Sequence, residues 1–290
     1  MTSSYLDRLA ARSRATNTVL CLGLDPDPDS IPERFSKGVA GLERFAELVL
    51  EATLPYVAAV KPNLAFFEAF GSAGIAALER LRASIPSDVP VIADAKRGDI
   101  GSTAARQAVA LFDVLGADAV TVSPYLGEAA IRPLLEREDR FAYVLCRTSN
   151  PGAGEVQDLA VGAEAGGAAG AAPERLHERI ARLASAWGPG GTVGLVVGAT
   201  APEELATIRR VAPGLPFLVP GVGAQGGEIE PVLRDGPATT APGGGRPGGG
   251  LLVNVSRGIA RAASGGPDDD PGERLAQAAA DWASRLPVLP

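Results

Sequence analysis

Charged side chains concentrate in one short stretch of the sequence, VIADAKRGDIGST at residues 91–103. Asp94 and Lys96 lie two residues apart at the end of an apolar run, so both side chains of a strand here would project from the same face. Asp99 follows in the next loop and could complete an Asp-Lys-Asp array. At the mouth of a barrel such an array could stabilise charge or deliver a proton. The alternative interpretation is that these residues form a buried ion pair with a purely structural role.

Lysine is rare in this chain, and two of its lysines end apolar runs. Only Lys37, Lys61 and Lys96 are lysines, and the other 24 of the 27 basic residues are arginines. Lys61 ends the run AAVKPN, and Asp25 ends CLGLDPDP, although a loop-capping role is the alternative for this aspartate. Arginine is always charged, whereas lysine is a compact charge whose pKa moves readily and which can donate a proton. The positions of Lys61 and Lys96 therefore indicate a function, and Lys37 has no proposed role.

A glycine-rich loop and an arginine late in the sequence form a candidate phosphate site. Residues 221–226 read GVGAQG, but no strand ending in an acidic residue follows about 20 residues later, as a dinucleotide-binding loop would require. After a strand, such a loop can still offer backbone N–H groups to a phosphate. Arg257, in NVSRGIA, would supply charge for bidentate phosphate binding, and a surface ion pair is the alternative.

The composition excludes several other kinds of active site. The one histidine, His177, lies in PERLHERIARLA, an amphipathic-helix pattern in which we expect it at the surface. A single histidine argues against a histidine-centred triad and a multi-histidine zinc site. Cys21 and Cys146 lie in separate apolar runs, which favours buried thiols in a reducing compartment over a disulfide or a cysteine-rich metal site. We therefore expect no metal site.

Charge and hydropathy favour a cytoplasmic protein that binds neither nucleic acid nor membranes. The net charge is −7, and no basic clusters alternate with aromatic residues. The first residues lack the apolar stretch of a signal peptide, and no segment approaches about 20 consecutive apolar residues.

Eight short apolar runs bounded by Gly, Pro or Asp are predicted to be strands. They lie at residues 18–25, 56–63, 89–96, 118–124, 142–148, 192–198, 215–221 and 250–255. Helical patterns lie between and after them, at 40–53, 72–83, 102–115, 127–136, 173–187, 202–211 and about 273–285. Because the strands are apolar without alternation, both of their faces should be buried, as in a parallel sheet covered by helices. This order predicts one α/β domain over residues 1–290, a single (β/α)8 TIM barrel, with a doubly wound open sheet as the alternative.

Two segments rich in Gly, Ala and Pro interrupt this alternation of strands and helices, at residues 150–172 and 236–249. Both are predicted to be flexible loops. The first leaves the carboxyl end of a strand, which is the active face of a barrel, and could be a lid. The second precedes the last strand, so we expect a passive insertion on the opposite face. In the final helix, Asp270 can cap the first turn and Pro271 can occupy its first position.

Six motifs, in this order along the chain, resemble those of the orotidine 5′-phosphate decarboxylase family, in its longer bacterial branch. They are LGLDPD at 22–27, VKPN at 60–63, DAKRGDIGST at 94–103, TSNPGA at 148–153, PGVGAQGG at 220–227 and NVSRGI at 254–259. The D-x-K-x-x-D element is shared by a wider suprafamily. Lys61 together with Gln225 and Arg257 narrows the resemblance to the decarboxylase.

The resemblance implies a homodimer with shared active sites that converts orotidine 5′-monophosphate to uridine 5′-monophosphate and CO2. This reaction is the last step of de novo UMP biosynthesis and would need no cofactor. Lys61, Asp94, Lys96 and Asp99 would form a charged tetrad, with Asp99 contributed across the dimer interface. Lys96 would donate the proton to C6 of the pyrimidine.

The resemblance also implies a set of contacts to the nucleotide substrate. Asp25 and Lys61 would contact the ribose hydroxyls, together with Thr103 from the partner subunit. Ser149 would hydrogen-bond to the pyrimidine. Gln225 and Arg257 would hold the phosphate.

Three other functions are alternatives. A metal-dependent sugar-phosphate decarboxylase or hexulose-phosphate synthase shares D-x-K-x-x-D, but these enzymes usually place a Glu at the position of Lys61 to hold Mg²⁺. A Schiff-base aldolase would use Lys96 as its nucleophile. A non-catalytic phosphate-ligand-binding barrel would bind a nucleotide without turnover.

Overall fold

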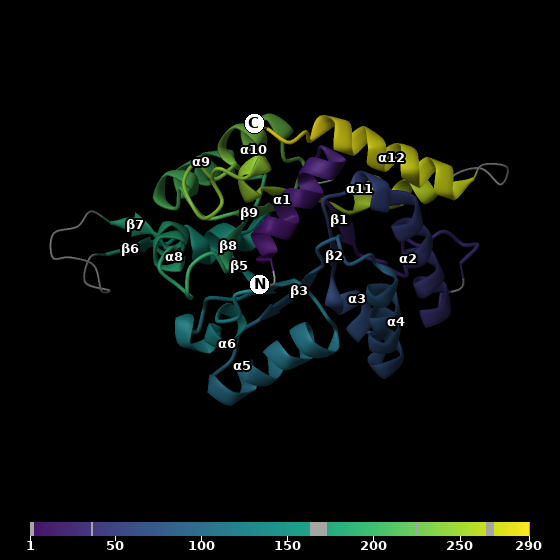
Figure 1. Cartoon of the computed structure of the whole chain (residues 1–290), viewed down its shortest axis with the longest axis horizontal. Helices are drawn as coiled ribbons and strands as arrows, with labels where there is room; N and C mark the ends of the chain where they lie inside the picture. Colours follow the sequence, from purple (N-terminus) through teal and green to yellow (C-terminus); the bar gives the residue numbers. More distant parts are fainter. Residues whose placement is uncertain (1–2, 36, 163–172, 224, 265–269, 290) are drawn as a thin grey trace.

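Eight parallel strands form the centre of the fold in a computed structural model that describes residues 3–35, 37–162, 173–223, 225–264 and 270–289 (Figure 1). The strands are β1 (Leu20–Leu24), β2 (Ala59–Pro62), β3 (Ile92–Arg97), β4 (Ala119–Val122), β5 (Phe141–Arg147), β8 (Val193–Val197), β9 (Phe217–Val219) and β10 (Leu252–Val255). They are hydrogen-bonded in the order β2-β1-β10-β9-β8-β5-β4-β3. Single bridges from Val60 to Val91 and from Asn63 to Asp94 join β2 to β3, so the sheet is a nearly closed barrel. The predicted (β/α)8 barrel is confirmed.

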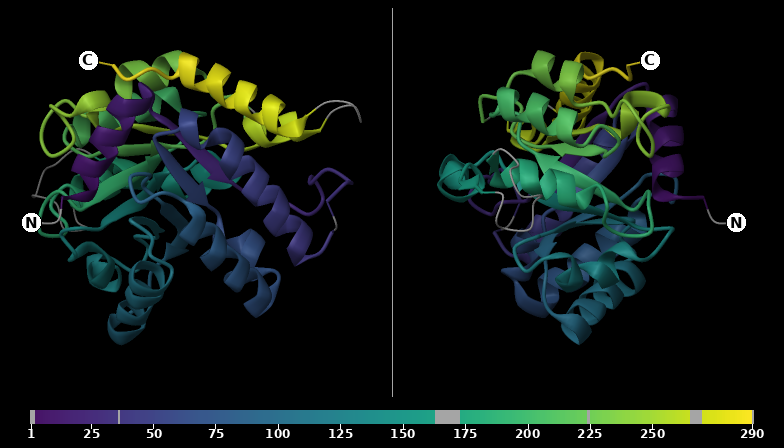
Figure 2. Two further views of the ribbon diagram at one scale, coloured as in Figure 1. Left: turned by 45° about the vertical axis from the view of Figure 1, so that its right-hand side comes forward. Right: turned by 90° about the vertical axis from the view of Figure 1, so that its left-hand side faces the viewer.

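Helices surround the strands on the outside of the barrel (Figures 1 and 2). The longer ones are α1 (Tyr5–Thr16), α2 (Val39–Thr53), α4 (Gly71–Ser84), α5 (Gly101–Ala108), α8 (Leu176–Ala184), α9 (Pro202–Val211), α10 (Ile229–Asp235) and α12 (Pro271–Arg285). Short helices are α3 (Leu64–Glu68), α6 (Arg132–Leu135), α7 (Gly154–Gln157) and α11 (Arg257–Ala260). The predicted helix at 102–115 continues from α5 into a π-helical turn, Val109–Val114. Helices α1, α3, α7, α10 and α11 were not predicted, and α7 lies within the predicted flexible loop at 150–172.

The last helix begins as its sequence predicts. The Asp270 side chain accepts a hydrogen bond of 2.8 Å from the backbone N–H of Gly272, and Pro271 is the first helical residue. The cap satisfies one of the N–H groups that have no partner within a helix.

Helix α1 closes the amino-terminal end of the barrel. Its residues Tyr5, Leu6 and Leu9 are buried in an inner core with side chains from the first residues of several strands, including Ile92 and Phe141. The rings of Tyr5 and Phe141 stack with their centroids 4.8 Å apart. Among the described residues, the amino-terminal end of the barrel is therefore filled by side chains.

Both cysteines are free and buried, as the sequence predicts. Burial raises the pKa of Cys21 to about 12 and raises that of Cys146 as well, so both remain protonated thiols. No helix within the described ranges is both long and apolar enough to cross a bilayer.

The glycine-rich segment 236–249 packs against the amino-terminal side of the barrel. Ala238 donates from its backbone N–H to Gly249, and Thr239 donates to Pro213, which precedes β9. Gly248 and Gly249 are buried with φ angles of 68° and 57°, in the left-handed region that glycine adopts without strain. Low complexity therefore does not leave this segment unpacked, and it lies far from the carboxyl ends of the strands.

Candidate active site

Three polar side chains extend the inner core toward the carboxyl ends of β2, β3 and β4. The core positions Ala59, Ile92 and Ala119 are each followed, two residues later, by a polar residue. Since alternate residues of a strand share a face, these polar side chains project into the mouth of the barrel. They are Lys61, Asp94 and Thr121.

One carboxylate lies between two lysines at this mouth. Lys61 Nζ lies 2.6 Å from Asp94 Oδ2, and Lys96 Nζ lies 2.6 Å from Asp94 Oδ1. The two lysines differ in exposure, since the Lys61 side chain is 6% exposed and that of Lys96 is 51% exposed. Lys61 is thus fixed inside the barrel, whereas Lys96 presents its ammonium group to the open space above.

Opposite charges keep Lys61 and Asp94 ionised despite their burial. Burial alone would raise the pKa of Asp94, but the charges of Lys61 and Lys96 outweigh burial and hold this pKa well below its usual range. Burial alone would lower the pKa of Lys61, but Asp94 and Asp25 outweigh it and raise that pKa. Asp94 and Lys61 are therefore both charged at neutral pH.

A break in the regular pairing of β3 and β4 brings Lys96 to Asp94. The register shifts between Ala93 and Arg97, and Lys96 has a φ of 48°, which costs a residue with a side chain about 1 kcal/mol. The Thr121 hydroxyl accepts from the N–H groups of Ala95 and Lys96, at 3.0 Å each, and donates to Asp94 Oδ1 at 2.8 Å. Thr121 holds the strained segment in place, and its only sequence signal was its inward position on β4.

Asp99 does not join this array within one chain. Its carboxylate accepts from the N–H of Ile100 at 2.7 Å, and its own N–H donates to the carbonyl of Ala130. Thr103 is exposed on α5, and Ile100 is 72% exposed. The predicted Asp-Lys-Asp array is therefore incomplete in this chain.

Asp25 presents an unpaired oxygen on the same rim. Its Oδ1 atom is buried and has no hydrogen-bond partner in the described part of the chain. A buried acceptor without a partner is costly, so this oxygen is suited to a ligand hydroxyl.

A cavity of about 430 Å3 opens above the array. It is lined by Lys61, Asp94, Lys96, Thr121, Leu145, Thr148, Ser149, Asn150, Gln157, Val196, Leu218 and Pro220. Charged groups therefore form one side of the cavity, and the loop after β5 forms another. Of the predicted lid at 150–172, residues 163–172 lie outside the described residues.

Ser149 enters this lining because two neighbouring residues have no side chain. A Cβ atom on Gly198 would lie 2.8 Å from the Ser149 backbone nitrogen, and one on Gly221 would lie 2.9 Å from Ser149 Cβ. Neither distance occurs between real atoms of this kind, so both glycines are needed for the approach. The loops after β8 and β9 thereby fix the position of Ser149.

The two predicted phosphate residues lie on segments that share one aromatic support. Trp282 of α12 donates from Nε1 to the carbonyl of Gly258, and a Cβ on Gly223 would lie 2.8 Å from its ring. The glycine-rich loop and the start of α11 therefore meet at this indole. Gln225 is exposed on the loop, and Arg257 is exposed with no hydrogen bond or ion pair among the residues described. Trp282 was not predicted, because it lies far from both motifs in sequence.

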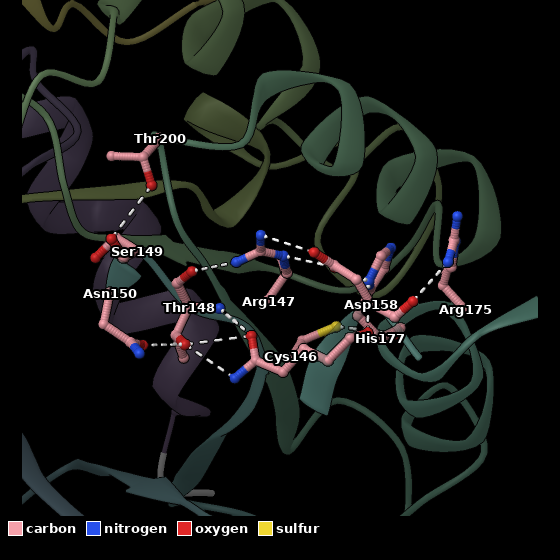
Figure 3. A network of polar contacts seen from close by, with 10 residues as sticks. Cys146, Arg147, Thr148, Ser149, Asn150, Asp158, Arg175, His177 and Thr200 are labelled. Carbon is pink, nitrogen blue, oxygen red and sulfur yellow. Dashed lines mark hydrogen bonds and ion pairs between the residues drawn. The ribbon is translucent and has the colours of Figure 1, made fainter. Parts of the chain in front are cut away.

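His177 is buried, so the predicted surface position is wrong. It is 2% exposed, and its Nδ1 lies 2.9 Å from the carbonyl of Gln157 and 3.2 Å from Asp158 Oδ1 (Figure 3). The helical pattern is correct, but the loop after β5 folds back over α8 and covers the face that carries the histidine. His177 is absent from the cavity lining.

A metal has no obvious ligand set here. The described ranges contain no group of three or more His, Cys, Asp or Glu side chains placed to hold an ion.

Residues 18–267 match the family described as "Orotidine 5′-phosphate decarboxylase / HUMPS family". This range contains every strand of the barrel and all of the cavity lining. The chain belongs to this family.

Similar proteins in the orotidine 5′-phosphate decarboxylase family align over nearly their whole length. Orotidine 5′-phosphate decarboxylase of Herpetosiphon aurantiacus is 45% identical over 275 residues, covering 94% of this chain and 96% of that protein. The enzyme of the same name from Thermomicrobium roseum is 46% identical, covering 98% and 93%. The crystal structure of a putative orotidine-monophosphate-decarboxylase from Toxoplasma gondii is 38% identical, with a TM-score of 0.81 and coverage of 96% and 93%.

Proposed function

We propose that this chain decarboxylates orotidine 5′-monophosphate to uridine 5′-monophosphate and CO2, with the array of Lys61, Asp94 and Lys96 as its reaction centre. The near-full-length relatives carry the name of this enzyme, and the family that the chain matches includes it. The observation that carries the assignment of the centre is the single carboxylate held between a buried and an exposed lysine beside the cavity. The product belongs to de novo pyrimidine biosynthesis, and the free, buried cysteines fit a cytoplasmic location.

The reaction needs a cation beside the reacting carbon. When the bond from C6 to the carboxylate carbon breaks, its electron pair stays on C6 in the plane of the ring, where no π-system delocalises it. A fixed positive charge must therefore stabilise the developing carbanion. Lys96 is suited to this role because its ammonium group faces the cavity and is held by Asp94. Its proton then passes to C6, and the neutral amine is reprotonated from water.

Polar groups of the cavity wall, and others on the segments that follow β1, β9 and β10, are suited to the rest of the nucleotide. The unpaired oxygen of Asp25, together with Lys61, would bind ribose hydroxyls. Ser149, fixed in the cavity wall, would hydrogen-bond to the pyrimidine. Gln225 and the unpaired Arg257 would hold the phosphate, and binding energy from this remote group can be used at the reacting carbon.

A homodimer with shared sites explains the position of Asp99. Its carboxylate does not reach the array of its own chain, and the segments around it carry exposed apolar side chains. Ile100, Tyr125 and Leu126 are 72%, 86% and 55% exposed. Apolar groups gathered in this way are typical of an interface, through which Asp99 and Thr103 would reach the site of the partner subunit.

The direct test of the function is turnover with and without a chelator. The purified protein should convert orotidine 5′-monophosphate, followed by its loss of absorbance, at a rate that EDTA leaves unchanged. Loss of activity in EDTA and its return with Mg²⁺ would favour the metal-dependent alternative. Borohydride trapping of an adduct on Lys96 would favour the aldolase. Tight nucleotide binding without turnover would favour the non-catalytic binding barrel.

Gly198→Ala should lower kcat/KM roughly 10- to 100-fold, because the added methyl group displaces Ser149 from its position beside the substrate. Steady-state kinetics would measure the loss. Gly38→Ala is the matched control, since a Cβ there would meet no atom within 4 Å. An unchanged kcat/KM in Gly198→Ala would contradict the role of Ser149.

A further inference from the structure

The loop that carries Ser149 is closed at its base by two cross-links. Arg147 and Asp158 form a bidentate ion pair, with Nε to Oδ1 at 2.9 Å and Nη2 to Oδ2 at 3.1 Å (Figure 3). One residue further in, Gln157 Oε1 accepts from the backbone N–H of Thr148 at 2.8 Å, and Gln157 Nε2 donates to the Thr148 hydroxyl at 2.9 Å. We call residues 147–158 the Ser149 loop.

Gln157 lines the cavity, yet both ends of its amide group bind Thr148. Thr148 is bonded directly to Ser149, so the amide fixes the backbone from which the serine side chain projects. The Thr148 hydroxyl also lies 2.6 Å from Asn150 Oδ1, on the other side of the serine. The contacts of Gln157 thus act on Ser149 through Thr148.

Gln157 itself is anchored from behind by a buried group. Its backbone carbonyl accepts from His177 Nδ1 at 2.9 Å, and the carbonyl of His177 accepts from the thiol of Cys146 at 3.1 Å. Cys146 is buried in β5, and His177 is buried in α8. The returning arm of the Ser149 loop, which carries Gln157 and Asp158, is therefore hydrogen-bonded to α8, and α8 is hydrogen-bonded to β5.

Ser149 is also confined from the other side. Gly198 and Gly221 contact it closely, and the hydroxyl of Thr200 lies 3.4 Å from its carbonyl oxygen. These contacts limit its movement toward β8 and β9. The opposite direction, toward the returning arm of the loop, is controlled by the link from Thr148 to Gln157.

We propose that Gln157 is a positioning residue, which holds Ser149 against the pyrimidine through its double hydrogen bond to Thr148. This inference rests on the proposed function and on the proposed contact of Ser149. The same inference gives the buried His177 a structural role, in which it fixes the backbone of Gln157 and takes no part in proton transfer.

Gln157→Met tests the proposal, because methionine keeps the length of the side chain and removes both amide groups. We expect kcat/KM for orotidine 5′-monophosphate to fall about tenfold, mostly through kcat, with a thermal unfolding midpoint close to that of the wild type. Gln277→Met is the matched control, since Gln277 is exposed on α12, and its kcat/KM should not change. If Gln157→Met does not fold, Thr148→Val removes only the hydroxyl that Gln157 Nε2 contacts and should give a smaller loss.

The deciding measurement is a double-mutant cycle with Ser149→Ala. If Gln157 acts through Ser149, adding Gln157→Met to Ser149→Ala should lower kcat/KM by less than about twofold. Two full, independent losses would mean that Gln157 contacts the substrate itself and would overturn the proposal. A Ser149→Ala variant with wild-type kinetics would also overturn it while leaving the decarboxylase function intact. Failure of the function would instead appear as a wild-type protein without turnover.

Discussion

Lys96→Ala should abolish decarboxylation, with a fall in kcat on the order of 10⁴-fold or more, because the variant loses both the cation beside C6 and the proton donor. The Lys96 side chain is 51% exposed, so its removal creates no buried void. Lys61 stays within 2.6 Å of Asp94, and no buried charge is left without a partner. The loss should therefore be one of chemistry rather than of folding.

Two measurements distinguish a loss of chemistry in Lys96→Ala from a loss of folding. Calorimetry should show that Lys96→Ala binds uridine 5′-monophosphate and unfolds at nearly the wild-type temperature, while the absorbance assay shows no turnover. Lys37→Ala is the control of the same residue type, since Lys37 is exposed outside the cavity, and it should keep the wild-type rate. Full turnover by Lys96→Ala would refute the mechanism.

Mixing two inactive variants should restore activity if Asp99 acts in the site of the partner subunit. Each site of a Lys96→Ala homodimer lacks its lysine, and each site of an Asp99→Ala homodimer lacks its cross-subunit carboxylate. In the mixed dimer, one site carries both defects and the other carries none. Random exchange makes half of the dimers mixed, so the mixture should reach about a quarter of the wild-type rate.

A second mixture supplies the control for this experiment. Asp94 and Lys96 contact each other within one chain, so Lys96→Ala and Asp94→Ala each damage the site of their own subunit. Every site of that mixed dimer has one defect, and no activity should return. If native mass spectrometry shows subunit exchange and the Asp99→Ala mixture still stays inactive, the shared site is wrong.

The strands could be predicted because a strand buried on both faces has a continuous apolar sequence, which can be recognised without knowing its neighbours. Continuous apolar runs predict buried parallel strands wherever they occur, and all eight fall where expected. Helix α1 was missed because its apolar residues, Tyr5, Leu6 and Leu9, are few, and their role is to fill the end of a barrel that forms later in the chain. Local sequence does not contain that information.

The candidate site could be predicted only as far as single strands position it. Lys61, Asp94 and Lys96 follow from where their strands end, and the structure brings them together. Thr121 was not predicted, because threonine is ordinary in a strand and its role depends on a register shift in the neighbouring strand. His177 was placed on the wrong side of its helix, because the loop that covers it is distant in sequence.

The indole that contacts both candidate phosphate-binding segments should give this barrel a spectroscopic property. Trp282 is one of only two tryptophans in the chain, and it contacts both Gly258, next to Arg257, and the glycine-rich loop that carries Gln225. Its fluorescence depends on the packing and polarity around the ring. Movement of either segment onto a phosphate would change that emission, so occupancy of this end of the site can be followed without an added dye and without chemistry at the other end.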